Sequence, residues 1–86
     1  MIRTFHRVWI GNQDPPHDFA DRWLDVNPGW TLVDWTDDDL GWLTSRDLFD
    51  QAESLTPPWY VTRFRANLAR YEILAVHGGV YLDWDF

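Results

Sequence analysis

The sequence predicts a layered α/β fold with a small, mostly parallel sheet. Three short apolar segments alternate with segments whose apolar residues recur at helical spacing. Turn residues separate them at Gly11-Asn12, Asn27-Pro28-Gly29 and Gly78-Gly79. The order strand, helix, strand, helices, strand is typical of parallel sheets, because parallel neighbours need a crossover between them. We therefore expect residues 1–86 to form a single α/β domain.

The first half of the chain contains two of the expected strands, over residues 5–10 and 30–35. Between them, residues 18–26 are expected to form a short helix, with Asp18 as its N-cap. Its apolar positions are Phe19, Trp23, Leu24 and Val26. An acidic turn follows the second strand, and we expect it to cap a short helix over residues 36–43.

The second half contains the longest expected element, a helix over residues 59–77 that opens after a pair of prolines. Its apolar stripe is predicted to be Phe64, Leu68, Tyr71 and Ala75. A shorter helix over 46–54 precedes it, with Ser45 as a candidate N-cap. Gly78 is the expected residue just past the long helix, and residues 80–84 form the last predicted strand.

Composition excludes several classes of protein. Hydrophobic residues make up 45% of the 86 residues, too many for a disordered segment. The net charge is −7 and every basic residue is Arg, so nucleic acid is not an expected partner. Arg3, His6 and Arg7 interrupt the N-terminal apolar stretch, which therefore predicts neither a signal peptide nor a membrane span. The lack of cysteine fits a cytoplasmic protein.

Two aspartates follow the last apolar segment, with one residue between them. Side chains alternate along a strand, so Asp83 and Asp85 are expected on the same face as Tyr81, opposite Leu82 and Trp84. Their Cα atoms would lie about 6.5–7 Å apart. Two neighbouring carboxylates repel each other, and Mg²⁺ or Mn²⁺ bound together with substrate phosphates removes the repulsion. In α/β sheets the ligand crevice lies beyond the carboxyl ends of the strands, where this pair would stand.

The alternative is that the pair is a coincidence of an Asp-rich sequence. A second acidic triplet, Asp37-Asp38-Asp39, is interpreted as a solvated turn or a helix cap. The spacing of Asp83 and Asp85 therefore carries no weight alone. The favourable observation is its context, an apolar strand preceded by two glycines and a long helix.

Polar residues on the long helix form a second candidate group. Arg63, Asn67 and Arg70 are spaced to share one helix face, which is either an ordinary solvated face or part of the same crevice. In the second case an Arg would hold a phosphate or a sugar hydroxyl. Trp9 ends the first strand and either stacks on a nucleobase or packs in the core. His6 is expected to be a buried or edge histidine rather than a ligand.

Three blocks resemble the glycosyltransferases that carry a sugar-binding region with a DXD motif: IRTFHRVWIGN, NPGWTLVDWTDDD and RANLARYEILAVHGGVYLDWDF. The resemblance implies a three-layer Rossmann-like half domain of the GT-A type, a nucleotide-diphosphate sugar as donor and a retaining reaction. It implies that Asp83 and Asp85 hold Mn²⁺ or Mg²⁺ against the diphosphate. It also implies donor contacts from Trp9, Asn67, Arg70, Tyr81 and Asp83, with Asn67 standing where the family has Asp.

The chain ends directly after this motif, so the resemblance covers the donor-binding half of the family's domain. We expect the 86 residues alone to bind donor but to transfer sugar slowly or not at all, and to form a homo-oligomer or a complex with another chain. The alternative is a nucleotide-sugar-binding or protein-interaction module without turnover. A phosphatase-like fold that uses Asp-x-Asp is disfavoured, because that class needs further motifs downstream. The sugar, the nucleotide and the acceptor are not identified by the sequence.

Overall fold

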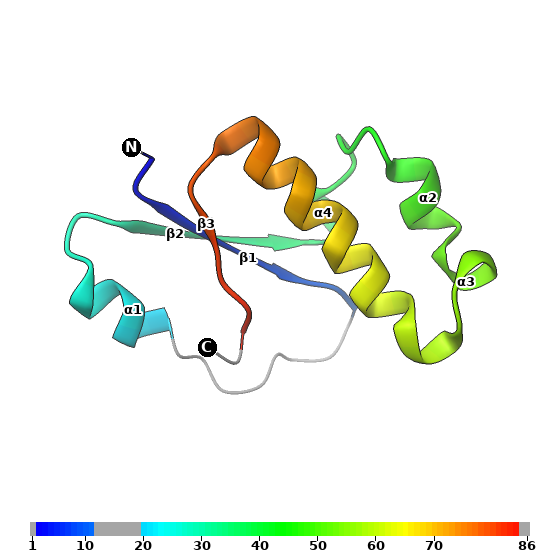
Figure 1. Ribbon diagram of the computed structural model, residues 1–86, viewed down its shortest axis with the longest axis horizontal. Coiled ribbons are helices and arrows are strands. Elements are labelled where there is room, and N and C mark those ends of the chain that lie inside the picture. Colours follow the sequence, from blue (N-terminus) through cyan, green and yellow to red (C-terminus); the bar gives the residue numbers. More distant parts are fainter. Residues whose placement is uncertain (1, 12–19, 85–86) are drawn as a thin grey trace.

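The computed structural model describes residues 2–11 and 20–84, which form an α/β fold. Its sheet has three strands, β1 (Thr4–Trp9), β2 (Thr31–Thr36) and β3 (Val80–Tyr81), in the order β2-β1-β3 (Figure 1). β1 pairs in parallel with both neighbours. The predicted small parallel sheet is therefore confirmed.

The helices differ from the predicted ones mainly at their ends and in their continuity. The α-helices and 3₁₀ turns, in chain order, are α1 (Ala20–Val26), η1 (Asp37–Asp39), α2 (Arg46–Asp50), α3 (Ala52–Leu55), η2 (Pro58–Tyr60) and α4 (Val61–His77). The helix expected over 36–43 is only η1, and the one expected over 46–54 is interrupted at Gln51. Asp18 and Phe19 lie outside the described residues.

Helices lie against both faces of the sheet, as alternation along β1 shows. Phe5 contacts Trp23 of α1, with ring centroids 6.1 Å apart. Val8 instead belongs to the buried cluster that includes Ala69 and Ile73 of α4. Residues three positions apart on a strand face opposite sides, so α1 and α4 cover opposite faces of the sheet. Figure 1 shows α4 lying across the strands, with α2 and α3 beside it.

The main core lies between the sheet and α4. Its buried members are Val8, Ile10, Leu40, Leu43, Phe49, Ala69 and Ile73. The predicted apolar stripe of α4 is wrong at Tyr71, which is 66% exposed. Ala66, Ala69 and Ile73 form the face that packs on the core, and a residue two positions past Ala69 points to the other side of the helix. Val26, expected on the apolar face of α1, is exposed as well.

The turn that precedes α2 is held by Glu72, a residue of α4. Glu72 accepts hydrogen bonds from the backbone N–H groups of Thr44 (2.7 Å) and Ser45 (3.0 Å) and from both hydroxyls. Burial acts to raise the pKa of Glu72, but these hydrogen bonds outweigh it and lower the pKa to about 2. Ser45 therefore occupies the predicted N-cap position of α2, but its side chain makes no capping hydrogen bond and instead ties this turn to Glu72 of α4.

The acidic triplet after β2 has the structural role predicted for it. The backbone N–H of Thr36 donates to Asp39 (2.9 Å), which closes the 3₁₀ turn η1. The backbone N–H of Gly11 donates to Asp37 (3.0 Å), so the end of β1 is fixed beside the end of β2. Asp38 is exposed.

Two glycines let the chain turn from α4 into β3. Gly78 follows the helix with φ 67°, and Gly79 has φ 89°, both in the region that favours glycine. A Cβ on Gly79 would lie 2.5 Å from the carbonyl oxygen of Thr4. This close approach to β1 lets β3 form parallel pairs immediately after the turn.

His6 stabilises the turn at Gly78 and Gly79 through a hydrogen bond. Its Nδ1 accepts a hydrogen bond from the Trp35 indole N–H (3.1 Å), so its other nitrogen, Nε2, carries the proton and donates to the Gly78 carbonyl (3.0 Å). The side chain is 2% exposed, which confirms a buried histidine. Burial lowers the pKa of His6 below 6.5, the Gly78 hydrogen bond raises it, and nearby His77 lowers it further.

We predict that Gly79→Ala destabilises the fold by at least about 2 kcal/mol, from an unfavourable φ and a contact that only a shift of β3 can relieve. Gly41→Ala is the matched control, because a Cβ there meets nothing within 4 Å. Urea denaturation followed by tryptophan fluorescence measures both. Equal stability of the two variants would contradict the close-approach argument.

We also predict that stability falls as the pH drops below about 6.5, because the unfolded chain takes up a proton at His6 that the folded chain excludes. His6→Gln should be less stable than the parent at pH 8, yet lose less stability between pH 7 and pH 5.5. His77→Gln is the control and should keep most of the pH dependence. Thermal midpoints across this range test the prediction, which fails if the parent and His6→Gln show the same slope.

Candidate functional site

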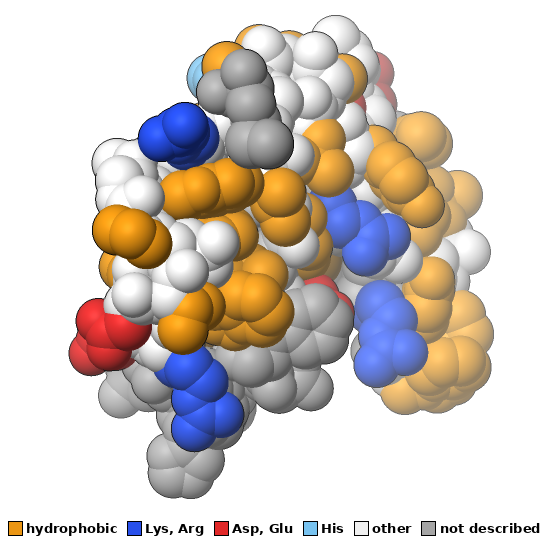
Figure 2. Space-filling view, turned by 60° about the vertical axis from the view of Figure 1, so that its left-hand side comes forward, with side chains coloured by type: hydrophobic (Ala, Val, Ile, Leu, Met, Phe, Trp, Pro, Cys, Tyr) orange, Lys and Arg blue, Asp and Glu red, His pale blue; other side chains and the backbone are white. Residues whose placement is uncertain are grey.

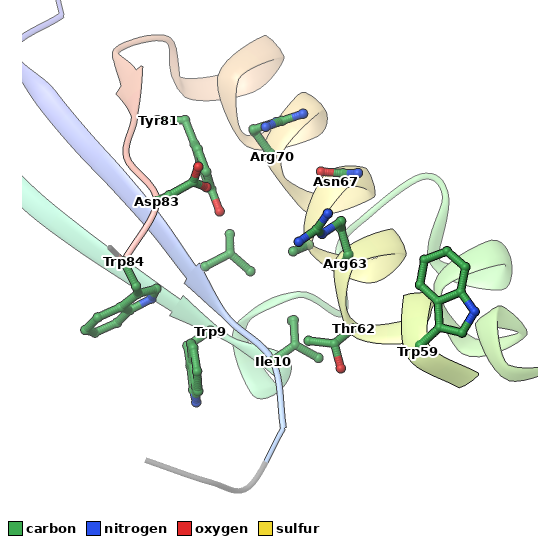
Figure 3. A pocket seen from close by; sticks show the side chains of 12 residues that line it. Trp9, Ile10, Trp59, Thr62, Arg63, Asn67, Arg70, Tyr81, Asp83 and Trp84 are labelled. Carbon is green, nitrogen blue, oxygen red and sulfur yellow. The ribbon is translucent and has the colours of Figure 1, made fainter. Parts of the chain in front are cut away.

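A pocket of about 700 Å³ opens at the carboxyl ends of β1 and β3. Its walls come from three segments that are far apart in sequence, over residues 8–10, 59–70 and 81–84 (Figure 3). On the face drawn in Figure 2, arginine side chains lie beside a hollow bordered by hydrophobic ones. The pocket therefore lies between the residues that follow β1, the residues that follow β3 and the first half of α4.

The strand order explains why the pocket lies here. From β1 the chain crosses to β2 on one side, then returns past β1 to β3 on the other. Crossovers that run in opposite directions from adjacent parallel strands leave a crevice at their carboxyl ends. β1 and β3 are these strands, and the pocket is lined by Ile10, directly after β1, and by Asp83, two residues after the end of β3.

The pocket brings together every described residue predicted for the donor site: Trp9, Asn67, Arg70, Tyr81 and Asp83. Asp85, the second expected metal ligand, lies outside the described residues. Figure 3 shows Asp83 and Tyr81 on one side of the pocket and the α4 residues on the other. The individual roles assigned to these residues remain predictions.

One face of α4 supplies the cationic wall. Arg63, Asn67 and Arg70 all line the pocket, so the hypothesis of a merely solvated face does not describe their position. The Asn67 amide donates to the Tyr60 hydroxyl (3.3 Å), which orients it. The Arg70 guanidinium lies 5.5 Å from the centroid of the Tyr81 ring. Two guanidinium groups facing one carboxylate favour an anionic ligand over a cationic one.

Tyr81, which lies opposite α4 on the β3 side of the pocket, is a neutral hydrogen-bonding group. Burial raises the pKa of its phenol above 10.0, and the charge of Asp83 raises it further. Arg70 and a hydrogen bond with the Val8 backbone act in the opposite direction. The phenol therefore keeps its proton at neutral pH.

Several residues of the site were not found from the sequence. Trp59 and Thr62 extend the pocket along η2 and α4, and Trp59 is 81% exposed. Trp59 precedes Arg63 by four residues, so helical spacing was the available signal. Beneath the pocket, the Arg7 guanidinium lies 3.5 Å from the centroid of the Trp84 ring. Nothing local in the sequence indicated that contact.

Of the two aspartates predicted to hold a divalent cation, Asp83 is the one that the structure describes. Mg²⁺ in nucleotide sites uses one or two carboxylates and takes its other ligands from phosphates and water. Asp83 offers an exposed carboxylate in the pocket. Within residues 2–11 and 20–84, no three His, Asp or Glu side chains gather into a possible metal site.

In the same residues, no helix is long and apolar enough to cross a membrane.

The parallel three-stranded sheet with helices on both faces is consistent with part of a Rossmann-like domain. Residues 17–86 match the sequence profile of the glycosyltransferase sugar-binding region containing the DXD motif. The chain therefore belongs to this family.

Three curated relatives support the assignment. The chain is 28% identical to inositol phosphoceramide mannosyltransferase 3 of Schizosaccharomyces pombe, over 96% of the chain and 24% of the relative. It is 30% identical to a mannosyl phosphorylinositol ceramide synthase of Saccharomyces cerevisiae, over 96% and 22%. It is 29% identical to an uncharacterized glycosyltransferase of Acanthamoeba polyphaga mimivirus, over 93% and 34%.

The chain spans about a quarter to a third of the length of these relatives. No solved structure shows a significant match to it.

Proposed function

We propose that the chain binds a nucleotide-diphosphate sugar as the donor-binding part of a metal-dependent, retaining glycosyltransferase with a GT-A type fold. One observation carries the proposal: Trp9, Arg70 and Asp83, from three separate segments, line a single pocket. Membership of the family that contains the sugar-binding region supports the substrate class.

The chemistry of the pocket suits a diphosphate. Asp83 and Asp85 would hold Mn²⁺ or Mg²⁺, and the ion, when bound, would neutralise charge on the leaving diphosphate. Arg63 and Arg70 supply positive charge from the opposite wall. A charged guanidinium forms paired hydrogen bonds to phosphate oxygens or to the hydroxyls of a sugar. The neutral phenol of Tyr81 can donate a hydrogen bond to the same oxygens.

The aromatic residues suit the base and the sugar. Trp9 lines the pocket and meets Trp84 edge to face, with ring centroids 5.9 Å apart. A flat indole at this place can stack on a nucleobase. Two of the relatives are named for mannosyl transfer or for a mannosylated product, so GDP-mannose belongs in the panel of donors to be tested.

We predict that binding of UDP, GDP or their sugars requires Mn²⁺ or Mg²⁺, and that Asp83→Asn weakens the metal-dependent affinity by roughly tenfold or more. Asp38→Asn is the matched control, because it removes the same charge from the exposed η1 turn. Isothermal titration calorimetry with and without Mn²⁺ measures both variants. Equal nucleotide affinity without metal would refute the proposed role of Asp83.

An assay of sugar hydrolysis and transfer, run beside the binding titration, separates the enzyme from the alternative. A chain that binds a nucleotide sugar but neither hydrolyses nor transfers it, even with other segments of the protein supplied, would be a binding module without turnover.

We also propose that the β3 edge of the sheet takes part in association. β3 lies at one end of the strand order, and Val80 is 42% exposed there. Ile2, also exposed, lies 3.2 Å from a Cβ placed on Gly78, so apolar side chains surround the turn. An open strand edge beside apolar surface favours pairing with another chain.

We predict that the purified chain forms a dimer or a larger oligomer, and that Val80→Lys shifts it toward monomer. Light scattering over a range of concentrations measures both. Leu48→Lys, at an exposed position of α2, is the control. A parent chain that stays monomeric at high concentration would contradict the prediction.

A further inference from the structure

The segment that carries Asp83 follows the short strand β3. β3 ends at Tyr81, and one more backbone hydrogen bond follows it, from Leu82 N–H to the carbonyl of His6 (2.8 Å). Side-chain contacts add to the order of Asp83 and Trp84.

Trp84 adds to it by lying on Arg7. The two residues share the sheet face opposite the main core, because Arg7 alternates with Val8, which packs under α4. The Arg7 guanidinium carbon lies 3.5 Å from the centroid of the Trp84 ring. A cation over the face of an indole ring is attracted by the ring electrons, and more strongly where water is excluded.

Arg7 is a rigid platform for this contact. It is 2% exposed and donates two hydrogen bonds to the carboxylate of Asp34, from Nε (2.7 Å) and Nη2 (2.9 Å). Asp34 is its register partner on β2, so the platform is built into the sheet. The paired hydrogen bonds fix the plane of the guanidinium, which decides where the indole can lie.

We propose that Arg7 is a positioning residue for Asp83, acting through Trp84 to present the Asp83 carboxylate to the pocket. The inference rests on the proposed function of Asp83 as a metal ligand. It adds a chain of contacts, Asp34 to Arg7 to Trp84, that connects β2 to the metal-binding segment. Trp84 lines the pocket, whereas Arg7 and Asp34 are not among its lining residues.

The test compares Arg7→Lys, Trp84→Leu and Trp84→Phe. Lys keeps the charge but cannot form the planar paired contact, and Leu removes the ring. Both should weaken Mn²⁺ binding roughly ten- to a hundredfold, the range for residues that orient metal ligands. Trp84→Phe keeps a ring on the platform and should restore affinity to within about threefold of the parent. Calorimetric titration with Mn²⁺ alone gives the dissociation constants.

The matched control is Arg46→Lys. Arg46 also pairs with a carboxylate, Asp50 at 3.0 Å, and lies over an aromatic ring, Phe49 at 4.4 Å, but it does not line the pocket. Its substitution should leave Mn²⁺ affinity unchanged. Parent-like affinity in both Arg7→Lys and Trp84→Leu would overturn the proposal.

A second measurement needs no ligand. Amide hydrogen exchange at Leu82, Asp83 and Trp84 should become faster in Arg7→Lys and Trp84→Leu, and stay at the parent rate in Arg46→Lys. If the parent binds no Mn²⁺, the proposed function fails, and this exchange decides the positioning role separately. Unchanged exchange in both variants would overturn it. Trp84 lies after the sheet, so Trp84→Leu keeps the test open even if Arg7→Lys fails to fold.

Discussion

The site depends on the close parallel contact between β1 and β3 that begins at Gly79. Its backbone approaches the Thr4 carbonyl so closely that a Cβ would lie 2.5 Å from that oxygen. His6 holds the preceding residue through the Gly78 carbonyl, in the neutral form that its bond to Trp35 requires. This contact determines where β3 begins, and therefore where Asp83 enters the pocket. The strain-free conformations of two glycines make it possible.

The acidic residues of this chain differ in the groups that their carboxylates contact. Asp37 and Asp39 accept backbone hydrogen bonds around η1, and Glu72 does so in the turn that precedes α2. Asp34 balances the buried charge of Arg7. Asp83 is different, because it faces a pocket whose other wall holds Arg63 and Arg70. A chain with net charge −7 thus keeps a local surface suited to an anionic ligand.

The sequence was most informative where a residue type admits one conformation or a pattern repeats. Paired glycines after a long amphipathic segment predicted the turn into β3, and spacing on α4 predicted that Arg63, Asn67 and Arg70 share a face. Prediction failed where packing overrides local preference. Tyr71 fits an apolar stripe by spacing but is exposed, because the core contacts a different face of α4. Ser45 takes the predicted N-cap position, yet its side chain makes no capping hydrogen bond, because Glu72 from α4 binds the backbone and the hydroxyl there.

By itself, the sequence determined the class of fold, the order of its elements and the residues that were candidates for donor binding. These follow from local periodicity, turn chemistry and motif spacing, which are properties of neighbouring residues. Tertiary structure alone decided that Trp9, Asn67 and Asp83 line one pocket, and that Arg7 lies beneath Trp84. These contacts join residues dozens of positions apart. They exist only because β1 lies between β2 and β3 in a parallel sheet, an arrangement set by long-range packing.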